Sequence, residues 1–278
     1  MPAKWLPSCR SPEEGNDGNR HSVLCSSGMD ANRRDRTPRL SIGPPRRWWA
    51  DDALHSALLE RLSVSLDGPR LNPLSNSTPS SLVVLIHGYG SNGDDLISLA
   101  TMIQPALPDT AFVAPNAPSQ ITRMAAAHQW WPIETFSMAE RAAGAAAAAP
   151  GLNDFISEEL DRAGLTSARL LLVGFSQGTM MALHVGLRRP EQVAGIVGIS
   201  AMLVAPERLP EQIKSRPPVL LIHGTNDNVV PFRSMDLASE ALEAVGVLVE
   251  THASPGVAHS VGQDGLAAAT AFARRVLR

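Results

Sequence analysis

Short, continuous runs of apolar residues recur along the chain from residue 82 onward. Their members are mostly β-branched or aliphatic, with no polar residue alternating between them. Runs of this kind are typical of β-strands that are covered on both faces. They predict strands over residues 82–86, 111–114, 170–173, 193–199, 219–222 and 247–251.

Helical patterns lie between and after these runs. They predict helices over residues 94–104, 151–163, 177–188, 232–245 and 263–277. Pro150 is expected to open the second of these helices and Gly164 to close it. The alanine tract over 142–149 also favours a helix, because alanine has the highest helix propensity. Alternating strands and helices predict an α/β fold with a mostly parallel central sheet and helices on both faces.

Residues 1–50 have a different composition. They are rich in Arg, Ser, Pro and Gly and have no periodic apolar pattern, so we expect a disordered or loosely attached N-terminal extension. This stretch carries nine Lys/Arg and five Asp/Glu, whereas residues 51–278 carry fifteen and twenty-two. We expect residues 51–278 to form a single domain with a short lid or insert over about 119–150. Its acidic balance makes nucleic acid an unexpected partner.

The two cysteines of the chain, Cys9 and Cys25, both lie in this N-terminal stretch. A disulfide framework and a cysteine-based zinc site are therefore excluded for the rest of the chain. No apolar run reaches the length of a transmembrane helix, and the N-terminus has no apolar signal segment. We expect a cytoplasmic protein without integral membrane association.

The pentapeptide GFSQG at 174–178 lies between a predicted strand and a predicted helix. This placement is typical of a nucleophile elbow, in which a tight turn exposes the hydroxyl of Ser176. Glycines on both sides let strand and helix approach closely, and the Gln177 amide at the helix start is aimed at a developing oxyanion. The alternative is a glycine-rich turn without catalytic function.

The tetrapeptide HGYG at 87–90 directly follows the first strong strand. In enzymes with a nucleophile elbow, the loop after this strand supplies a second oxyanion donor, which here would be the amide of Tyr89. Taken without Ser176, the same residues would indicate only a turn.

A nucleophilic serine needs a general base, and the base needs a carboxylate that orients it. Asp227 lies in the loop after the strand at 219–222, and His259 lies at the next strand–helix junction. Both therefore follow Ser176 in the order serine, acid, histidine that accompanies a nucleophile elbow. Asp227 could also serve as a turn residue. His87 and His223 each begin a His-Gly turn at a strand end, where a structural hydrogen bond is usual.

Most of residues 60–278 resemble the phospholipase/carboxylesterase family of α/β hydrolases, which includes small bacterial carboxylesterases and acyl-protein thioesterases. The resemblance rests on LVVLIHGYGSNGDDLISLA, FVAPNAP, HQWWPI, LLLVGFSQGTMMALHVGLRRP, PPVLLIHGTNDNVVP and SPGVAHSVGQDGLAAA. It implies an α/β-hydrolase fold that needs no cofactor and no metal. It also implies Ser176 as nucleophile, Asp227 as orienting acid and His259 as general base, with an oxyanion hole formed by the Tyr89 and Gln177 amides.

Three further residues are candidates for the substrate pocket. Trp130 and Trp131 are adjacent, so one is expected to pack and the other to form a pocket wall, whereas Met180 follows the elbow. The expected function is a serine carboxylic-ester hydrolase for small-molecule or lipid-like esters with short to medium acyl chains. An acyl-protein thioesterase, a lysophospholipase and a non-catalytic binding module on a hydrolase scaffold stay open, as does a homodimer.

Overall fold

The computed structural model describes residues 65–278, except for residues 123, 125 and 201. The expected extension over 1–50 lies outside the described residues and stays a prediction. In the described part of the chain, no helix is long and apolar enough to cross a membrane. The cytoplasmic location also stays a prediction.

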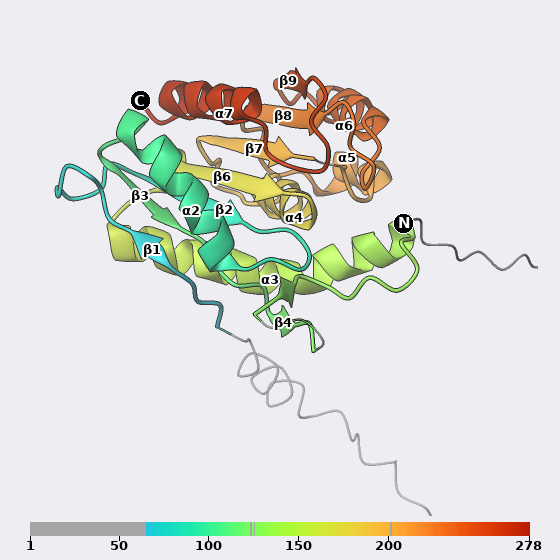
Figure 1. Cartoon of the computed structure of the whole chain (residues 1–278), viewed down its shortest axis with the longest axis horizontal. Coiled ribbons are helices and arrows are strands. Elements are labelled where there is room, and N and C mark those ends of the chain that lie inside the picture. Colours follow the sequence, from blue (N-terminus) through green and yellow to red (C-terminus); the bar gives the residue numbers. More distant parts are fainter. Residues whose placement is uncertain (1–64, 123, 125, 201) are drawn as a thin grey trace, which may run out of the picture. The chain divides into compact units, whose positions relative to one another are not determined.

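A seven-stranded sheet forms the centre of the fold, with strand order β1-β3-β2-β6-β7-β8-β9. Neighbouring strands are parallel except for β1, which pairs antiparallel with β3 (Figure 1). All six predicted strands are present, with ends shifted by up to three residues; the short edge strand β1 has no apolar run and was not predicted. The strands are β1 Arg70–Leu71, β2 Ser81–Ile86, β3 Thr110–Val113, β6 Leu170–Phe175, β7 Gly195–Ile199, β8 Val219–Gly224 and β9 Val249–Ser254. A separate antiparallel pair is formed by β4 (Ser119–Gln120) and β5 (His128–Gln129).

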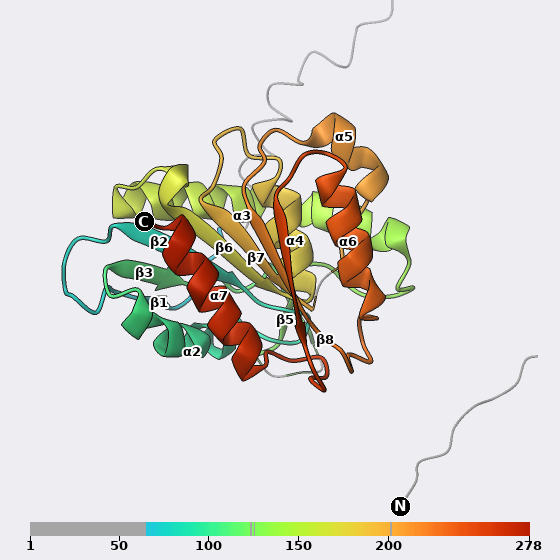
Figure 2. The ribbon, with the colours of Figure 1, turned by 90° about the horizontal axis from the view of Figure 1, so that it is seen from above.

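Helices cover both faces of the sheet, as the sequence predicted. In Figure 2, α2 and α7 lie on one side of the sheet, and α3, α5 and α6 lie on the other. Alternate residues of β2 enter the two cores: Leu82, Val84 and Ile86 pack with α3, α4 and α6, while Val83 and Leu85 pack with α2 and α7. The helices are α2 Gly93–Ile103, α3 Met138–Ala163, α4 Gln177–Gly186, α5 Leu209–Gln212, α6 Arg233–Glu243 and α7 Gln263–Val276.

The start of α3 differs from the prediction. The helix expected over the alanine tract at 142–149 is present, but Pro150 does not open a second helix: one helix begins at Met138 and contains Pro150 in its interior. Proline lacks the N–H that would bond the carbonyl four residues earlier, which disfavours this position. Three features outweigh that loss: the alanine tract, buried residues on both sides of Pro150, and a cap in which Ser137 Oγ accepts the Glu140 N–H at 3.1 Å. The expected insert over 119–150 therefore comprises β4, β5, a loop and the first half of α3.

The first half of α3 packs closely on Trp131. A Cβ atom on Gly144 would lie 2.2 Å from Trp131 Cγ, so only glycine lets the helix approach the indole this closely. Gly151 of the same helix has no such neighbour, because a Cβ atom there would meet nothing within 4 Å. Substitutions at Gly144 and Gly151 therefore distinguish the effect of helix propensity on stability from the effect of packing.

We expect Gly144→Ala to destabilise the protein and Gly151→Ala to stabilise it. Alanine gains about 0.8–1.0 kcal/mol over glycine inside a helix, but overpacking costs about 1–3 kcal/mol. Packing should therefore dominate at Gly144, whereas propensity alone acts at Gly151. Urea denaturation of both variants measures the two free energies of unfolding. Equal changes of the same sign in both would contradict the close contact between α3 and Trp131.

Candidate active site

Ser176 lies at the sharp turn between β6 and α4. Its backbone angles are φ 53° and ψ −116°, a strained conformation for a residue other than glycine. The Ser176 N–H donates to the Ile199 carbonyl at 2.9 Å, which fixes the turn to β7. A Cβ atom on Gly178 would lie 1.9 Å from the carbonyl oxygen of Ile86, so glycine is required where α4 crosses the end of β2.

His259 links Ser176 to Asp227 through a chain of hydrogen bonds. His259 Nδ1 lies 2.8 Å from Asp227 Oδ2, and His259 Nε2 lies 3.1 Å from Ser176 Oγ. With a carboxylate at Nδ1, the neutral imidazole carries its proton there, so Nε2 accepts from the serine hydroxyl. The structure thus brings together three residues that lie far apart in the sequence.

The Asp227 carboxylate is held by donors on both oxygens. Oδ1 accepts the Val229 and Val230 amides, each at 2.9 Å, while Oδ2 accepts from His259. Burial opposes ionisation of Asp227, but the hydrogen bonds from His259, Val230 and Val229 outweigh it and hold its pKa below the usual value. His223 Nε2 lies 2.9 Å from the Val230 carbonyl and 3.3 Å from Oδ2. Its N–H therefore supports the same loop, in the structural role expected of this histidine.

The two backbone amides expected to donate to the oxyanion belong to segments that adjoin Ser176. Gln177 is the first residue of α4, and Tyr89 lies in the loop after β2. In the part of the chain that the structure describes, neither amide donates a hydrogen bond to another residue. A Cβ atom on Gly88 would lie 3.3 Å from Ser176 Cβ, which shows how closely the 87–90 loop approaches the elbow. Neither amide is thus engaged by the described residues, and their function as oxyanion donors stays a prediction.

His87 fixes the conformation of this loop. The buried imidazole accepts the Ala117 N–H at Nε2, 2.9 Å away, and its Nδ1 lies 2.7 Å from the Gly88 carbonyl. Since Nε2 accepts, Nδ1 carries the proton and donates to Gly88. Burial lowers the pKa of His87 to about 4, so the ring stays neutral at pH 7 and keeps both hydrogen bonds.

A cavity of about 300 Å³ opens beside Ser176 and His259. Trp131 and Met180, two of the three expected pocket residues, line this cavity. Trp130, the third, does not: it is buried behind the site, where its Nε1–H donates to the His87 carbonyl at 2.9 Å. The lining also includes residues to which the sequence did not point, namely Ile133, Phe136, Arg141, Val229 and Val230.

Comparison with known proteins places the chain in a family. The family model described as Phospholipase/Carboxylesterase matches residues 74–277. The chain belongs to this family. The crystal structure of esterase PE8 is similar, with 45% identity, a TM-score of 0.74 and coverage of 77% of this chain and 100% of that chain. Acyl-protein thioesterase 1 of Schizosaccharomyces pombe is 28% identical over 78% of this chain and 99% of its own length. The corresponding thioesterase of Gibberella zeae is 26% identical over 75% and 97%.

Membership in this family confirms the predicted α/β-hydrolase fold and makes the chain a serine hydrolase. The crystal structure of acyl-protein thioesterase 2 from Zea mays has 21% identity and a TM-score of 0.61, and it adds support for the fold alone. Among the described residues, no group of three His, Cys, Asp or Glu side chains is placed to hold a metal ion.

Two of the unexpected lining residues carry a sequence signal. Val229 and Val230 directly follow Asp227 in a polar loop, and an apolar pair in such a loop is unusual. Phe136 lies just before α3 and Arg141 lies in its first turn. Neither was identified from the sequence, because the start of α3 was not predicted correctly. Phe136 has a positive φ of 56°, and its carbonyl accepts a hydrogen bond from Arg141 Nη1.

The Gln177 side chain has a function that the sequence did not indicate. It is buried, its Oε1 accepts the Trp130 N–H at 2.9 Å, and its Nε2–H donates to the Trp131 carbonyl at 3.0 Å. The residue whose amide is a candidate oxyanion donor thus also holds, through its side chain, the segment that forms a wall of the cavity.

We expect Gln177→Met to destabilise the hydrolase by about 2–4 kcal/mol, because it leaves the Trp130 N–H and the Trp131 carbonyl buried without partners. As Trp131 lines the cavity, KM for a neutral ester should rise more than kcat falls. The control is Met181→Leu, a swap of similar volume at a buried position of the same helix that is expected to cost less than about 1.5 kcal/mol. Equal free energies of unfolding for the two variants would show that the hydrogen bonds of the Gln177 side chain do not stabilise the protein.

Proposed function

We propose that this hydrolase cleaves carboxylic esters with short to medium acyl chains through an acyl-enzyme on Ser176. The hydrogen-bonded series Ser176–His259–Asp227, at a strained turn beside an apolar cavity, is the observation that carries the proposal. In this assignment Ser176 is the nucleophile, His259 the general base and Asp227 the carboxylate that orients it.

In the acylation half-reaction, Ser176 Oγ attacks the ester carbonyl carbon while His259 Nε2 takes its proton. The carbonyl oxygen becomes an oxyanion, which the Tyr89 and Gln177 amides stabilise by donating to it. As the tetrahedral intermediate collapses, the bond to the alkoxy oxygen breaks and His259 Nε2–H protonates the leaving alcohol. The acyl group is then an ester of Ser176.

Water completes the cycle. His259 removes a proton from the water, whose oxygen attacks the acyl carbon, and the same two amides stabilise the second oxyanion. Collapse expels Ser176 Oγ, which takes the proton from His259, and the carboxylic acid leaves. In both half-reactions, the ionised Asp227 stabilises the imidazolium through Nδ1, which its lowered pKa supports.

The walls of the cavity support an apolar acyl group of limited length. Trp131, Ile133 and Met180 offer apolar surface beside Ser176, and burial of each methylene contributes about 0.8 kcal/mol. A space of about 300 Å³ also has to accept part of the alcohol, so only the first methylenes of the acyl chain can be buried. Longer chains should extend into solvent and gain nothing further.

A second candidate function is thioester hydrolysis on acylated proteins. Thioesters and oxyesters share the tetrahedral intermediate, and the curated relatives above carry the name acyl-protein thioesterase. A lysophospholipase would use the same residues. A binding module without catalysis is the weaker alternative, because it gives no reason for keeping the three side chains in hydrogen-bond contact.

Ser176→Ala, His259→Ala and Asp227→Asn should each lower kcat/KM for p-nitrophenyl butyrate by about 10⁴-fold or more. Because such groups act as a unit, the Ser176→Ala/His259→Ala double variant should be no slower than the single variants. The matched control is His252→Ala, which removes another histidine paired with a carboxylate, 2.9 Å from Asp264 and outside the cavity. A His259→Ala variant as active as this control would refute the assignment of the base.

Across p-nitrophenyl esters from acetate to palmitate, kcat/KM should rise, peak at roughly C4 to C8 and then fall. Trp131→Ala should flatten this preference more than it lowers activity on acetate, since acetate hardly reaches the indole. A steady rise to palmitate would contradict the small acyl pocket and favour a lipase or a depalmitoylating thioesterase. Matched butyryl esters and thioesters measured in parallel separate the two candidate functions.

A further inference from the structure

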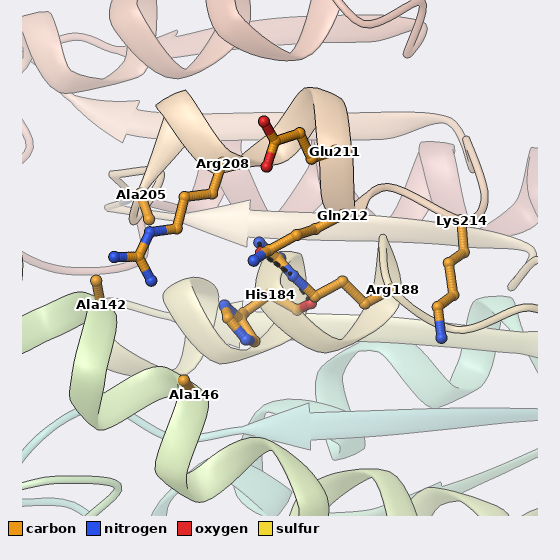
Figure 3. Close-up of a pocket in the computed structure, with 9 residues that line it drawn as sticks. All are labelled: Ala142, Ala146, His184, Arg188, Ala205, Arg208, Glu211, Gln212 and Lys214. Atoms are coloured by element: carbon orange, nitrogen blue, oxygen red, sulfur yellow. Dashed lines mark hydrogen bonds between the residues drawn. The ribbon is translucent and has the colours of Figure 1, made fainter.

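A second cavity, of about 470 Å³, lies on the helical side of the fold that carries α3. Its walls come from α3, from the end of α4, and from the segment formed by the 3₁₀ turn Pro206–Arg208 and α5 (Figure 3). Neither Ser176 nor His259 lines it. The lining residues are Ala142, Ala146, His184, Arg188, Ala205, Arg208, Glu211, Gln212 and Lys214.

This cavity gathers positive charge in a chain whose residues 51–278 are acidic overall. The lining includes three cationic side chains, Arg188, Arg208 and Lys214, and a single carboxylate, Glu211. In Figure 3, Arg208 and Lys214 lie at opposite ends of the cavity and Arg188 lies between them. Within the described residues, neither Arg188 nor Lys214 forms an ion pair, and the carboxylate of Glu207 is 3.9 Å from Arg208.

Among the residues that the structure describes, the hydrogen-bond partners of Arg188 are all neutral. Its Nε and Nη2 donate to Gln212 Oε1 at 3.0 and 2.6 Å, and its Nη1 donates to the His184 carbonyl at 3.0 Å. Burial lowers the pKa of this guanidinium, and no carboxylate among the described residues offsets the loss of water. Since a guanidinium has five N–H groups, Arg188 keeps two for a ligand. An anion would supply the missing countercharge.

His184 is a second unsatisfied group in the wall. It is 9% exposed, and its buried Nδ1 has no hydrogen-bond partner among the described residues. Burial, with a smaller effect of Arg188, lowers the pKa of His184 to about 4, so the ring is neutral at pH 7. Buried polar atoms without partners are rare in folded proteins. The His184 ring also lines the cavity, so a ligand there would meet a neutral imidazole beside the cations.

We propose that this cavity binds a phosphate-bearing small molecule, held by Arg188, Arg208 and Lys214. The lining carries a net charge of +2 with His184 neutral, and a phosphate monoester carries about −1.5 to −2 at pH 7. Arginine presents paired N–H groups that match phosphate oxygens. The methyl groups of Ala142 and Ala146 leave room for the carbon skeleton of the ligand.

The position of the cavity allows two sources for the phosphate. Adjacent residues of α3 line the two cavities: Arg141 lines the one at Ser176 and Ala142 lines this one. On α4, Met180 lines the first cavity and His184 the second, one helical turn or about 6 Å further along the helix. The phosphate can therefore belong to a free ligand or to the far end of an ester held at Ser176. The second source rests on the proposed function, whereas the first does not.

Binding is tested by titration calorimetry of the full chain with pyrophosphate and with inorganic phosphate at low ionic strength. We expect saturable binding to a single site. Arg208→Gln should weaken it about threefold and Arg208→Gln/Lys214→Gln about tenfold, whereas Glu211→Gln should strengthen it. The control is Arg233→Gln, which removes the same charge from an exposed position on α6. No saturable binding, or equal weakening by Arg208→Gln and Arg233→Gln, would overturn the proposal.

The source is identified by hydrolysis of 1-butyrylglycerol and 1-butyrylglycerol 3-phosphate. Where the phosphate belongs to the substrate, the wild-type protein prefers the phosphorylated ester and Arg208→Gln/Lys214→Gln loses that preference. Where it belongs to a free ligand, both esters are cleaved alike although pyrophosphate still binds. The calorimetric measurement of phosphate binding does not depend on catalysis. If the phosphate site is absent, no saturable binding is measured, whereas if the proposed esterase activity is absent, phosphate still binds but neither ester is hydrolysed.

Discussion

Gly178 packs against the carbonyl oxygen of Ile86 so closely that no side chain fits between them. This contact presses the first turn of α4 onto the end of β2 and leaves Ser176 in a strained conformation, with φ at 53°. The loop after β2 also approaches the elbow closely, since a Cβ atom on Gly88 would lie 3.3 Å from Ser176 Cβ. Placement of the candidate nucleophile thus depends on one close approach between helix and strand.

The groups around this elbow are connected through buried hydrogen bonds. Gln177 binds the backbone of Trp130 and Trp131, the Trp130 indole donates to the His87 carbonyl, and His87 in turn binds Gly88 and Ala117. Because these groups are buried, loss of one bond leaves its partner unsatisfied. The wall of the cavity and the oxyanion loop are therefore expected to respond together to substitutions in this network.

Much of the fold could be predicted because strands covered on both faces leave continuous apolar runs, as at residues 82–86. Candidate catalytic residues could be found because Ser176, Asp227 and His259 each follow a recognisable strand, in a fixed chain order. Their contact itself could not be predicted, since it depends on how three loops meet at the edge of the sheet. The start of α3 was missed because proline usually opens a helix, whereas here the cap at Ser137 and the packing around Pro150 carry the helix past it.

Other features leave no local pattern. The role of the Gln177 side chain follows from a segment nearly fifty residues earlier in the chain, and Trp130 differs from Trp131 only in which neighbours it meets. The cations of the second cavity are likewise spread over 188–214, and only the packing of α3, α4 and α5 brings them to one space.

The central claim, that Ser176 is activated by His259 and Asp227, is tested most directly by covalent labelling. The protein is treated with a p-nitrophenyl alkylphosphonate, and the modified residue is identified by peptide mass spectrometry while the rate of labelling is followed. Our account predicts a single label on Ser176, with much slower labelling in His259→Ala and Asp227→Asn. A label on another residue, or labelling of Ser176 at an unchanged rate in both variants, would contradict it.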